Sequence, residues 1–178
     1  MKRIFSTVLL VCVLATCLFA FASCGQHPLQ MVKSNLQNGN YTLGTEEMNM
    51  KVDGNKYEVA VDMFGVKTTM YLEVADDTVY MYTPKVVSEG YTKTEISADE
   101  AGDYTEVFDE ERMEKLFNPD NFTEQDDGTY VLNTGIEIDG ATDVKIKVVD
   151  DDCTITVAGV SMTISDMGNT TVTLPEVE

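Results

Sequence analysis

The sequence predicts a mainly β protein with two or three helices, an α+β chain built on one antiparallel sheet. From Lys56 to Pro84, apolar and polar residues alternate in three successive runs, separated by Gly65 and by Asp76-Asp77. This pattern is typical of an antiparallel meander with one apolar face. The alternation resumes near Tyr130 and continues to Leu174. Together these segments predict about ten strands, enough for a strongly curved sheet that forms a half-barrel.

The first 23 residues predict a secretory signal peptide. Lys2 and Arg3 form a basic start, the stretch 4–22 is mostly apolar, and the small residues Ala22-Ser23 precede Cys24. Such a segment is removed on export and is too short and too poorly flanked to remain as a spanning helix. We therefore exclude residues 1–23 from the fold.

Cys24 is the predicted site of lipid attachment. The stretch 21–25, Phe-Ala-Ser-Cys-Gly, resembles a bacterial lipobox, in which the cysteine is acylated, with palmitate for example, and becomes the new N-terminus. Several acyl chains hold a protein stably on a membrane. We expect an exported protein anchored to the extracytoplasmic face of the cell membrane. The alternative is ordinary secretion, with Cys24 as a free thiol.

Residues 24–28 would be the lipidated cysteine and a short linker, and residues 29–178 a single domain. The only histidine of the chain, His27, lies in this linker, where we expect it to be exposed to solvent. The net charge of −19 excludes nucleic acid as a partner and opposes binding to anionic lipid by charge. We expect a monomer.

The N-terminal half of the domain is assigned from periodicity and stop signals. Residues 29–37 predict a short helix because Leu29, Val32 and Leu36 recur at helical spacing before Asn38-Gly39. Residues 41–52 predict the first strand. The three strands of 56–84 follow, and residues 89–96 predict another.

Residues 97–121 interrupt the alternation with an acidic segment that still carries apolar side chains. Asp109 can cap a helix over 110–117, and Phe108 can pack on Met113. Asn118-Pro119 would end that helix. Its apolar face would comprise Met113, Leu116 and Phe117.

The C-terminal half predicts five strands separated by Asp- and Gly-rich turns. The apolar residues that alternate with polar ones in these strands are Tyr130, Leu132, Ile136 and Ile138; Val144, Ile146 and Val148; Cys153, Ile155 and Val157; Val160, Met162 and Ile164; Val172 and Leu174. Cys153 has no predicted partner for a disulfide, and we expect it to be a small buried side chain.

No pattern of catalytic residues stands out, and we expect a non-enzyme without cofactor or metal. The acidic pairs, such as Asp76-Asp77 and Asp150-Asp152, coincide with turns, where turn chemistry explains them. One histidine and one unpaired cysteine do not favour zinc or Cys-His catalysis. No nucleophile elbow, phosphate loop or dinucleotide fingerprint occurs.

Methionine is the unusual residue, with ten in the chain. Three interpretations are open: plain core filling, a flexible lining for variable apolar ligands, or capture of copper(I) by thioethers. No clustered methionine run supports copper. Most of the methionines align with the apolar face of the predicted strands.

The order of motifs resembles the LolA-like and LppX-like lipoprotein-carrier superfamily. It runs from the lipobox and short helix through a strand ending in Asp53-Gly54, then the meander with Val79-Tyr80-Met81-Tyr82 and the strand with Gly90-Tyr91-Thr92-Lys93, to an acidic helical insertion and a closing Val172-Thr173-Leu174-Pro175. Tyr91-Thr92-Lys93 matches the family's Trp-x-Lys with tyrosine in place of tryptophan. The resemblance implies an incomplete barrel with helices across its open side and lipid in the concavity.

We therefore expect a membrane-anchored lipoprotein that binds lipid or acyl chains, in lipid or lipoprotein trafficking, with the membrane contacted through Cys24. The alternative is a non-catalytic envelope scaffold whose half-barrel is filled by its own helices. Nine residues would line the cavity: Val59, Val61, Met63, Met70, Leu72, Val79, Met81, Met113 and Phe117.

Overall fold

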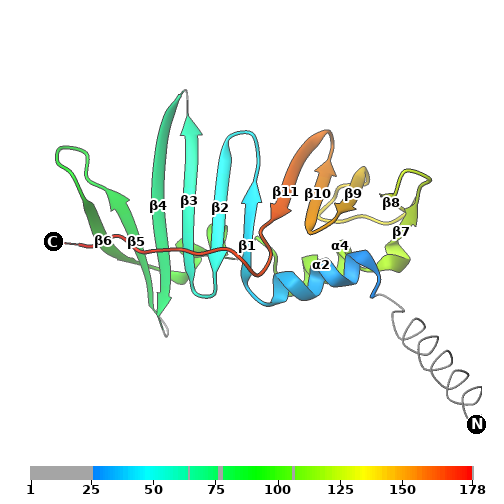
Figure 1. The fold of residues 1–178 in the computed structure, drawn as a ribbon, viewed down its shortest axis with the longest axis horizontal. Helices are drawn as coiled ribbons and strands as arrows, with labels where there is room; N and C mark the ends of the chain where they lie inside the picture. Colours follow the sequence, from blue (N-terminus) through cyan, green and yellow to red (C-terminus); the bar gives the residue numbers. More distant parts are fainter. Residues whose placement is uncertain (1–25, 64, 76–77, 106, 178) are drawn as a thin grey trace, which may run out of the picture.

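The computed structural model describes residues 26–63, 65–75, 78–105 and 107–177. In this part of the chain, eleven strands form one open antiparallel sheet in the order β6-β5-β4-β3-β2-β1-β11-β10-β9-β8-β7. Two consecutive meanders therefore lie side by side, joined where β1 pairs with β11 (Figure 1). The prediction of a mainly β, antiparallel protein is confirmed, and the sheet is not closed into a barrel.

The first meander contains β1 (Asn40–Gly44), β2 (Met48–Asp53), β3 (Lys56–Met63), β4 (Val66–Ala75), β5 (Thr78–Pro84) and β6 (Tyr91–Ile96). The second contains β7 (Phe122–Glu124), β8 (Thr129–Leu132), β9 (Val144–Val149), β10 (Asp152–Val157) and β11 (Val160–Ser165). The helices are α2 (Pro28–Gln37), α3 (Ala98–Thr105), α4 (Glu110–Leu116) and a 3-10 turn, η1 (Pro119–Asn121).

One face of the sheet carries the core. Along the ladder, Val59 pairs with Met50, Met50 with Leu43, Leu43 with Ile164, and Ile164 with Cys153, so all five side chains share that face. Each is at most 1% exposed. The apolar row therefore crosses the junction of the two meanders, which share one hydrophobic core.

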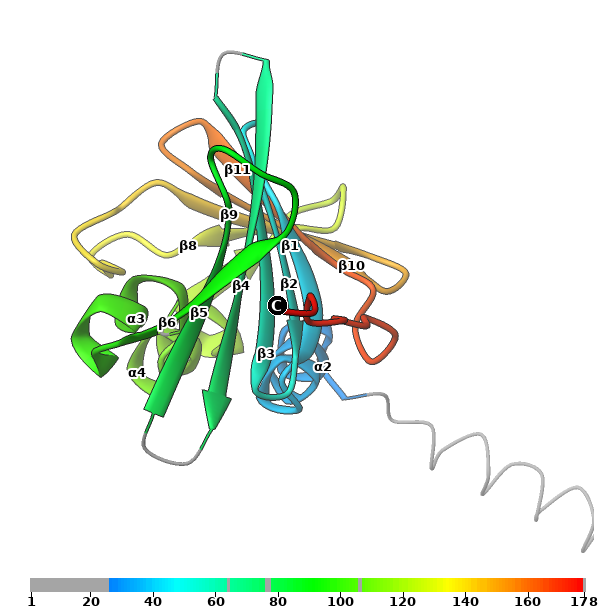
Figure 2. The same ribbon diagram turned by 90° about the vertical axis from the view of Figure 1, so that its left-hand side faces the viewer.

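The helices cover this inner face. Helix α2 buries Leu29, Val32 and Leu36, the three residues predicted from their spacing. Lys33 of α2 forms an ion pair with Glu114 of α4. Figure 2 shows α3 and α4 on one side of the sheet and the C-terminal segment on the other.

The C-terminal segment, residues 166–177, crosses the outer face of the first meander (Figure 1). Two side chains of β1 hold it: the Asn40 amide bonds both backbone groups of Thr170 at 2.8 Å, and the Thr42 hydroxyl lies 3.0 Å from that of Thr170. Asp53 of β2 accepts the N–H of Val172 at 3.2 Å. Val172 is 3% exposed, so the segment is packed on the sheet although it joins no ladder.

Three predicted elements are wrong in detail. The predicted strand 41–52 is a hairpin of β1 and β2, because Thr45 accepts the N–H of Met48 at 3.0 Å and turns the chain. Ile136 and Ile138 lie in a loop with one isolated bridge, Ile138 to Ala141, and not in a strand. Val172 and Leu174 form no strand, since side chains of β1 and β2 satisfy the backbone there.

Other local expectations are confirmed. Asp109 caps α4, accepting the N–H of Arg112 at 2.8 Å, and the helix ends at Leu116 with Phe117 as its C-cap. Cys153 is 0% exposed. His27, in contrast, is not an exposed linker residue. It caps α2 by accepting the N–H of Leu29 at 3.3 Å, and its half-buried ring packs at a tilt of 57° against that of Tyr130, with the ring centres 5.3 Å apart.

Candidate functional site

An apolar pocket of about 270 Å³ lies between α4 and the strands β9, β10 and β11. It is formed where the loop before α4, the helix itself and the loop before β9 meet the inner face of the second meander. Nine apolar side chains and one charged pair line it: Val107, Phe108, Leu116, Ile138, Ala141, Val144, Ile155, Val157 and Met162, with Arg112 and Asp139. A concave, mostly apolar site with few polar groups is typical of small-ligand binding.

The wall formed by the sheet follows from strand alternation. Val157 and Ile155 of β10 project to the same face two residues apart, and Met162 of β11 pairs directly with Ile155. Val144 of β9 pairs with Val157. Ile155 and Val144 are buried, whereas Val157 and Met162 are half-buried and border the open space.

A tight turn builds the opposite wall. Ile138 and Ala141 exchange both backbone hydrogen bonds, at 3.0 and 2.9 Å, around Asp139-Gly140. Both turn residues have positive φ, 51° and 80°, which is the geometry of a type I′ hairpin turn and explains the Asp-Gly sequence. The turn holds Ile138 and Ala141 against the cavity and leaves the Asp139 carboxylate at its rim.

Arg112 ties this turn to helix α4. Its Nε donates to Oδ2 of Asp139 at 2.6 Å, and its Nη1 donates to the carbonyl oxygen of Val107 at 2.5 Å. Its Nη2 lies 3.8 Å from Oδ2 of Asp109, the helix cap. One guanidinium therefore holds three segments of the pocket rim together, and two carboxylates compensate its charge.

The nine predicted cavity residues lie elsewhere. Val59, Leu72, Val79 and Phe117 are between 0% and 7% exposed and belong to the packed core. Val61, Met70, Met81 and Met113 are half-buried, and the side chain of Met63 lies outside the described residues. None of the nine lines the pocket under α4. Cys24 also lies outside the described residues.

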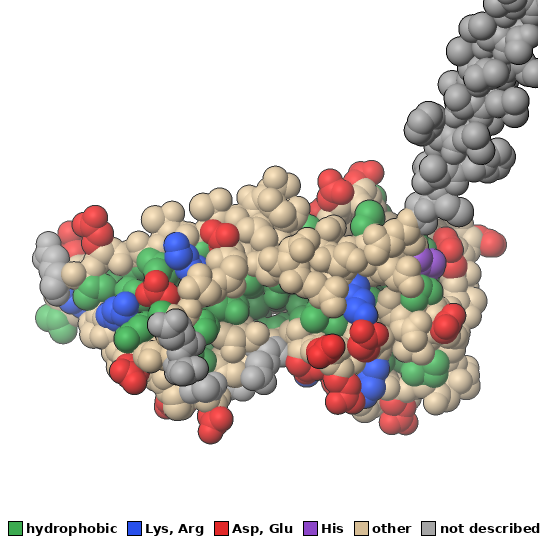
Figure 3. All heavy atoms as spheres, turned by 90° about the horizontal axis from the view of Figure 1, so that it is seen from below, with side chains coloured by type: hydrophobic (Ala, Val, Ile, Leu, Met, Phe, Trp, Pro, Cys, Tyr) green, Lys and Arg blue, Asp and Glu red, His purple; other side chains and the backbone are tan. Residues whose placement is uncertain are grey.

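Part of the inner face is open. Seen from below, hydrophobic side chains line a hollow between the first meander at the left and the charged residues of α4 at the right (Figure 3). Partly buried apolar side chains that pack on the core include Tyr57, Val74, Ile96 and Tyr104. Apolar surface on this face is therefore not confined to the pocket beneath α4.

Sequence reasoning missed the pocket because its walls come from distant segments. The alternation of Val144, Ile155, Val157 and Met162 predicts strands, but it does not show which of these residues border a cavity. Asp139-Gly140 was recognised as a turn signal. Only the fold shows that this turn lies against Arg112 of α4, 27 positions earlier in the chain.

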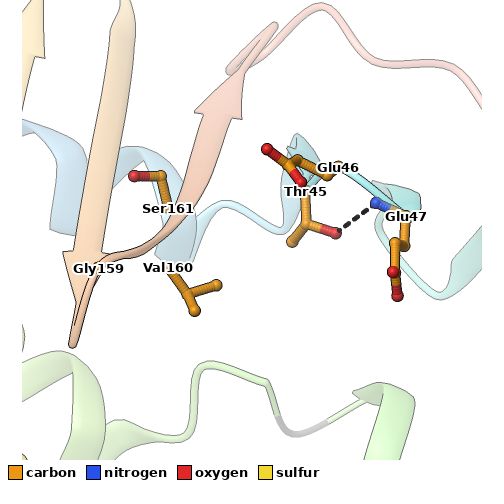
Figure 4. A pocket seen from close by; sticks show the side chains of 6 residues that line it. All are labelled: Thr45, Glu46, Glu47, Gly159, Val160 and Ser161. Carbon is orange, nitrogen blue, oxygen red and sulfur yellow. Dashed lines mark hydrogen bonds between the residues drawn. The ribbon is translucent and has the colours of Figure 1, made fainter.

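A second hollow, of about 410 Å³, separates the tips of two hairpins. The turn at Thr45, Glu46 and Glu47 faces the turn at Gly159, Val160 and Ser161, and Thr45 accepts the N–H of Glu47 (Figure 4). Its lining is polar and acidic apart from Val160, which is 72% exposed. Among the described residues, no three acidic, histidine or cysteine side chains are grouped so as to hold a metal ion.

The outer face carries a tyrosine and charge cluster on β4, β5 and β6. The Tyr82 hydroxyl donates to Oε2 of Glu73 at 2.7 Å, and the Lys93 ammonium donates to the same oxygen at 3.2 Å. Lys93 also lies 4.0 Å from the ring centre of Tyr80. The hydrogen bond from Tyr82 lowers the pKa of Glu73, and Lys93 contributes to the same effect, so this carboxylate is charged at neutral pH. The cluster thereby connects the edge strand β6 to β4 and β5.

Two buried groups titrate far from neutrality. Burial raises the pKa of the Cys153 thiol from 9.0 to about 12, and burial together with the neighbouring Tyr57 raises that of Tyr41 from 10.0 to about 12. A thiol that stays protonated is a poor nucleophile. Cys153 is thus a core residue.

Fold and pocket together define a mainly β protein with an open antiparallel sheet, helices on one face and a small apolar cavity beneath α4. No family model, no curated protein and no solved structure matches the chain. Within the described residues, no helix combines the length and the apolar character needed to cross a bilayer.

Proposed function

We propose that this protein is an exported lipoprotein that binds a single apolar chain of a lipid in the pocket beneath α4. The observation that carries the proposal is the lining of that pocket, in which nine of eleven side chains are apolar. Burying an apolar chain there removes both the chain and the half-buried Val157 and Met162 from water. Methionine adapts to chains of different shape.

The volume sets the size of the ligand. A water molecule occupies roughly 30 Å³ of liquid, and taking a methylene as similar gives space for roughly nine heavy atoms in about 270 Å³. One medium-length acyl or alkyl segment fits this space, and a whole phospholipid does not. A longer chain would extend toward the open apolar surface of the first meander.

The proposed anchor places the pocket near a membrane. His27 caps α2, so only Gly25 and Gln26 separate Cys24 from the folded domain. The three residue steps from Cys24 to His27 span at most about 10 Å. A domain lipidated at Cys24 would therefore stay beside its source of lipid. As part of the same proposal, the protein is a LolA-like carrier and its sheet is curved into a half-barrel.

A second candidate function has its own support. Val59, Leu72 and Phe117, which the sequence placed in a cavity, are 0 to 1% exposed and packed against other parts of the same chain. This packing favours a non-catalytic envelope scaffold whose concavity is filled by its own side chains. The two candidates differ in whether the pocket beneath α4 takes up a ligand.

A cavity-filling variant separates them. Ala141→Phe places a ring in the pocket, whereas Thr142→Phe adds the same ring to an exposed neighbour outside the lining. The domain is purified without its anchor, as Cys24→Ser, and titrated with 1-octanol while the melting temperature is recorded. If the protein is a carrier, 1-octanol should raise the melting temperature saturably. Ala141→Phe should abolish this rise, and Thr142→Phe should retain it. If 1-octanol does not raise the melting temperature of the Cys24→Ser domain without further substitution, the carrier function is refuted and the scaffold function remains.

A further inference from the structure

The apolar pocket beneath α4 has one charged pair in its lining. Two of the eleven lining side chains are charged, Arg112 and Asp139, and both lie at the mouth. An apolar chain that enters the pocket would leave its polar end beside this pair. The charge state of the pair therefore decides which polar end is tolerated.

The positive charge of Arg112 is already compensated by two carboxylates of the same chain. Asp139 accepts a hydrogen bond from its Nε at 2.6 Å, and Asp109 lies 3.8 Å from its Nη2. The Val107 carbonyl accepts a further bond from Nη1 at 2.5 Å. A ligand carboxylate or phosphate at the mouth would have to displace one of these acceptors or stay without a cation.

Nearby charges add to the effect. The segments 109–115 and 138–143 carry six carboxylates and two cations, Arg112 and Lys115. From neighbouring elements, Lys33 pairs with Glu114 and Lys145 lies 3.6 Å from Asp143, so carboxylates still outnumber cations. Lys115 is paired with Glu111 at 2.7 Å, one turn earlier on α4. Like charges close to a partly desolvated group raise the free energy of an anion placed there.

We infer that the pocket takes apolar chains with an uncharged or cationic end, such as alcohols and acylglycerols, and discriminates against fatty acids and other anionic lipids. The inference rests on the proposed function, because it concerns the same pocket. In this inference, Arg112 and Asp139 determine specificity because they contact the polar end of the ligand. The nine apolar lining residues contact its apolar chain.

Three probes of equal chain length test this selection: 1-octanol, octanoate and octylamine at neutral pH, titrated into the Cys24→Ser domain by calorimetry. We expect octanol and octylamine to bind at least about tenfold more tightly than octanoate, a ratio that corresponds to about 1.4 kcal/mol. Added salt should reduce the difference between octylamine and octanoate, because it screens rim charges.

Asp139→Asn is the diagnostic variant, since it removes one carboxylate from the mouth while asparagine still accepts the positive φ of the turn. Octanoate affinity should rise in this variant until it is within about threefold of octanol, a residual ratio of under 1 kcal/mol. Glu137→Gln is the matched control: it makes the same charge change at an exposed residue of the same loop that does not line the pocket. It should leave the preference unchanged.

Three results would overturn the inference, and they differ in whether they also overturn the proposed function. If octanoate binds as tightly as octanol, or more tightly, head-group selection is wrong and the lipid pocket stands. If none of the three probes binds, the proposed function fails and the selection fails with it. Equal effects of Asp139→Asn and Glu137→Gln would also refute a role for the Arg112–Asp139 pair.

Discussion

Arg112 and Asp139 are joined by a hydrogen bond of 2.6 Å from Nε to Oδ2, and this contact links helix α4 to a two-residue turn before β9. The side chains are 34% and 55% exposed, so the pair contributes little to stability. Its importance is geometric: it fixes Ile138 and Ala141 opposite Val157 and Met162, and thereby shapes the apolar pocket.

The first prediction concerns the core of the first meander. Leu72→Ala should lower the free energy of unfolding by about 2–5 kcal/mol, because Leu72 is 0% exposed and its loss leaves a cavity. Val160→Ala, at a residue 72% exposed, should change it by less than about 0.5 kcal/mol. Urea denaturation measures both. If Leu72→Ala lowered the free energy of unfolding as little as Val160→Ala does, the side chain of Leu72 would not be packed in the core.

The second prediction concerns alkaline pH. The folded state holds protons on Cys153 and Tyr41 up to about pH 12, whereas an unfolded thiol releases its proton near 9.0 and an unfolded tyrosine near 10.0. The unfolded state then binds fewer protons, so stability should be complete below pH 9 and fall as pH rises toward 12.

Urea midpoints between pH 8 and pH 11 check this dependence. Cys153→Ala should flatten the early part of the decline, because in the unfolded chain the thiol, with a pKa of 9.0, begins to titrate at lower pH than Tyr41, with a pKa of 10.0. A midpoint that is constant or rises over this range would show that these groups are not buried as described.

The third prediction concerns the C-terminal segment. Asn40→Ala removes the side chain that bonds both backbone groups of Thr170, at 2.8 Å each, and also Asp53 at 3.0 Å. We expect a loss of about 1–3 kcal/mol and faster hydrogen exchange of the Thr170 and Val172 amides. Asn49→Ala, at an exposed position of β2, is the control. Unchanged exchange in Asn40→Ala would mean that other contacts hold the segment.

The fourth prediction concerns the anchor. Cys24→Ala in the full chain should release the protein from membranes into the extracytoplasmic fraction, because no lipid can then be attached. Fractionation and immunoblotting give the distribution, with Cys153→Ala as a cysteine control that stays on the membrane. Retention of Cys24→Ala on membranes would refute lipid attachment at this residue.

Much of the sheet could be predicted from the sequence because local alternation determines it. The strands at 56–84 and the cap at Asp109 follow from neighbouring residues alone. The hairpin within 41–52 was missed because Gly44 is the last residue of β1, and the turn after it is held by the side chain of Thr45 and not by a glycine or proline within the loop. Helix α3 was not located because Gly102 and the acidic residues around it give a weak helical pattern.

The site could not be predicted because it depends on contacts between distant segments. Leu72 and Val157 show the same alternation in the sequence, yet one is 0% exposed in the core and the other is half-buried beside the pocket. What separates them is the packing around each strand. Val172 likewise alternates like a strand residue, although it packs on the sheet without joining a ladder.

The most direct test of ligand binding beneath α4 is a titration of the Cys24→Ser domain, labelled with ¹³C at the methionine methyl groups, with 1-octanol. Met162 lines the pocket, and Met50 is 1% exposed in the packed core of the same face. Binding in the pocket predicts a saturable shift of the Met162 methyl resonance while that of Met50 stays in place. No shift at Met162, or equal shifts at both residues, would contradict it.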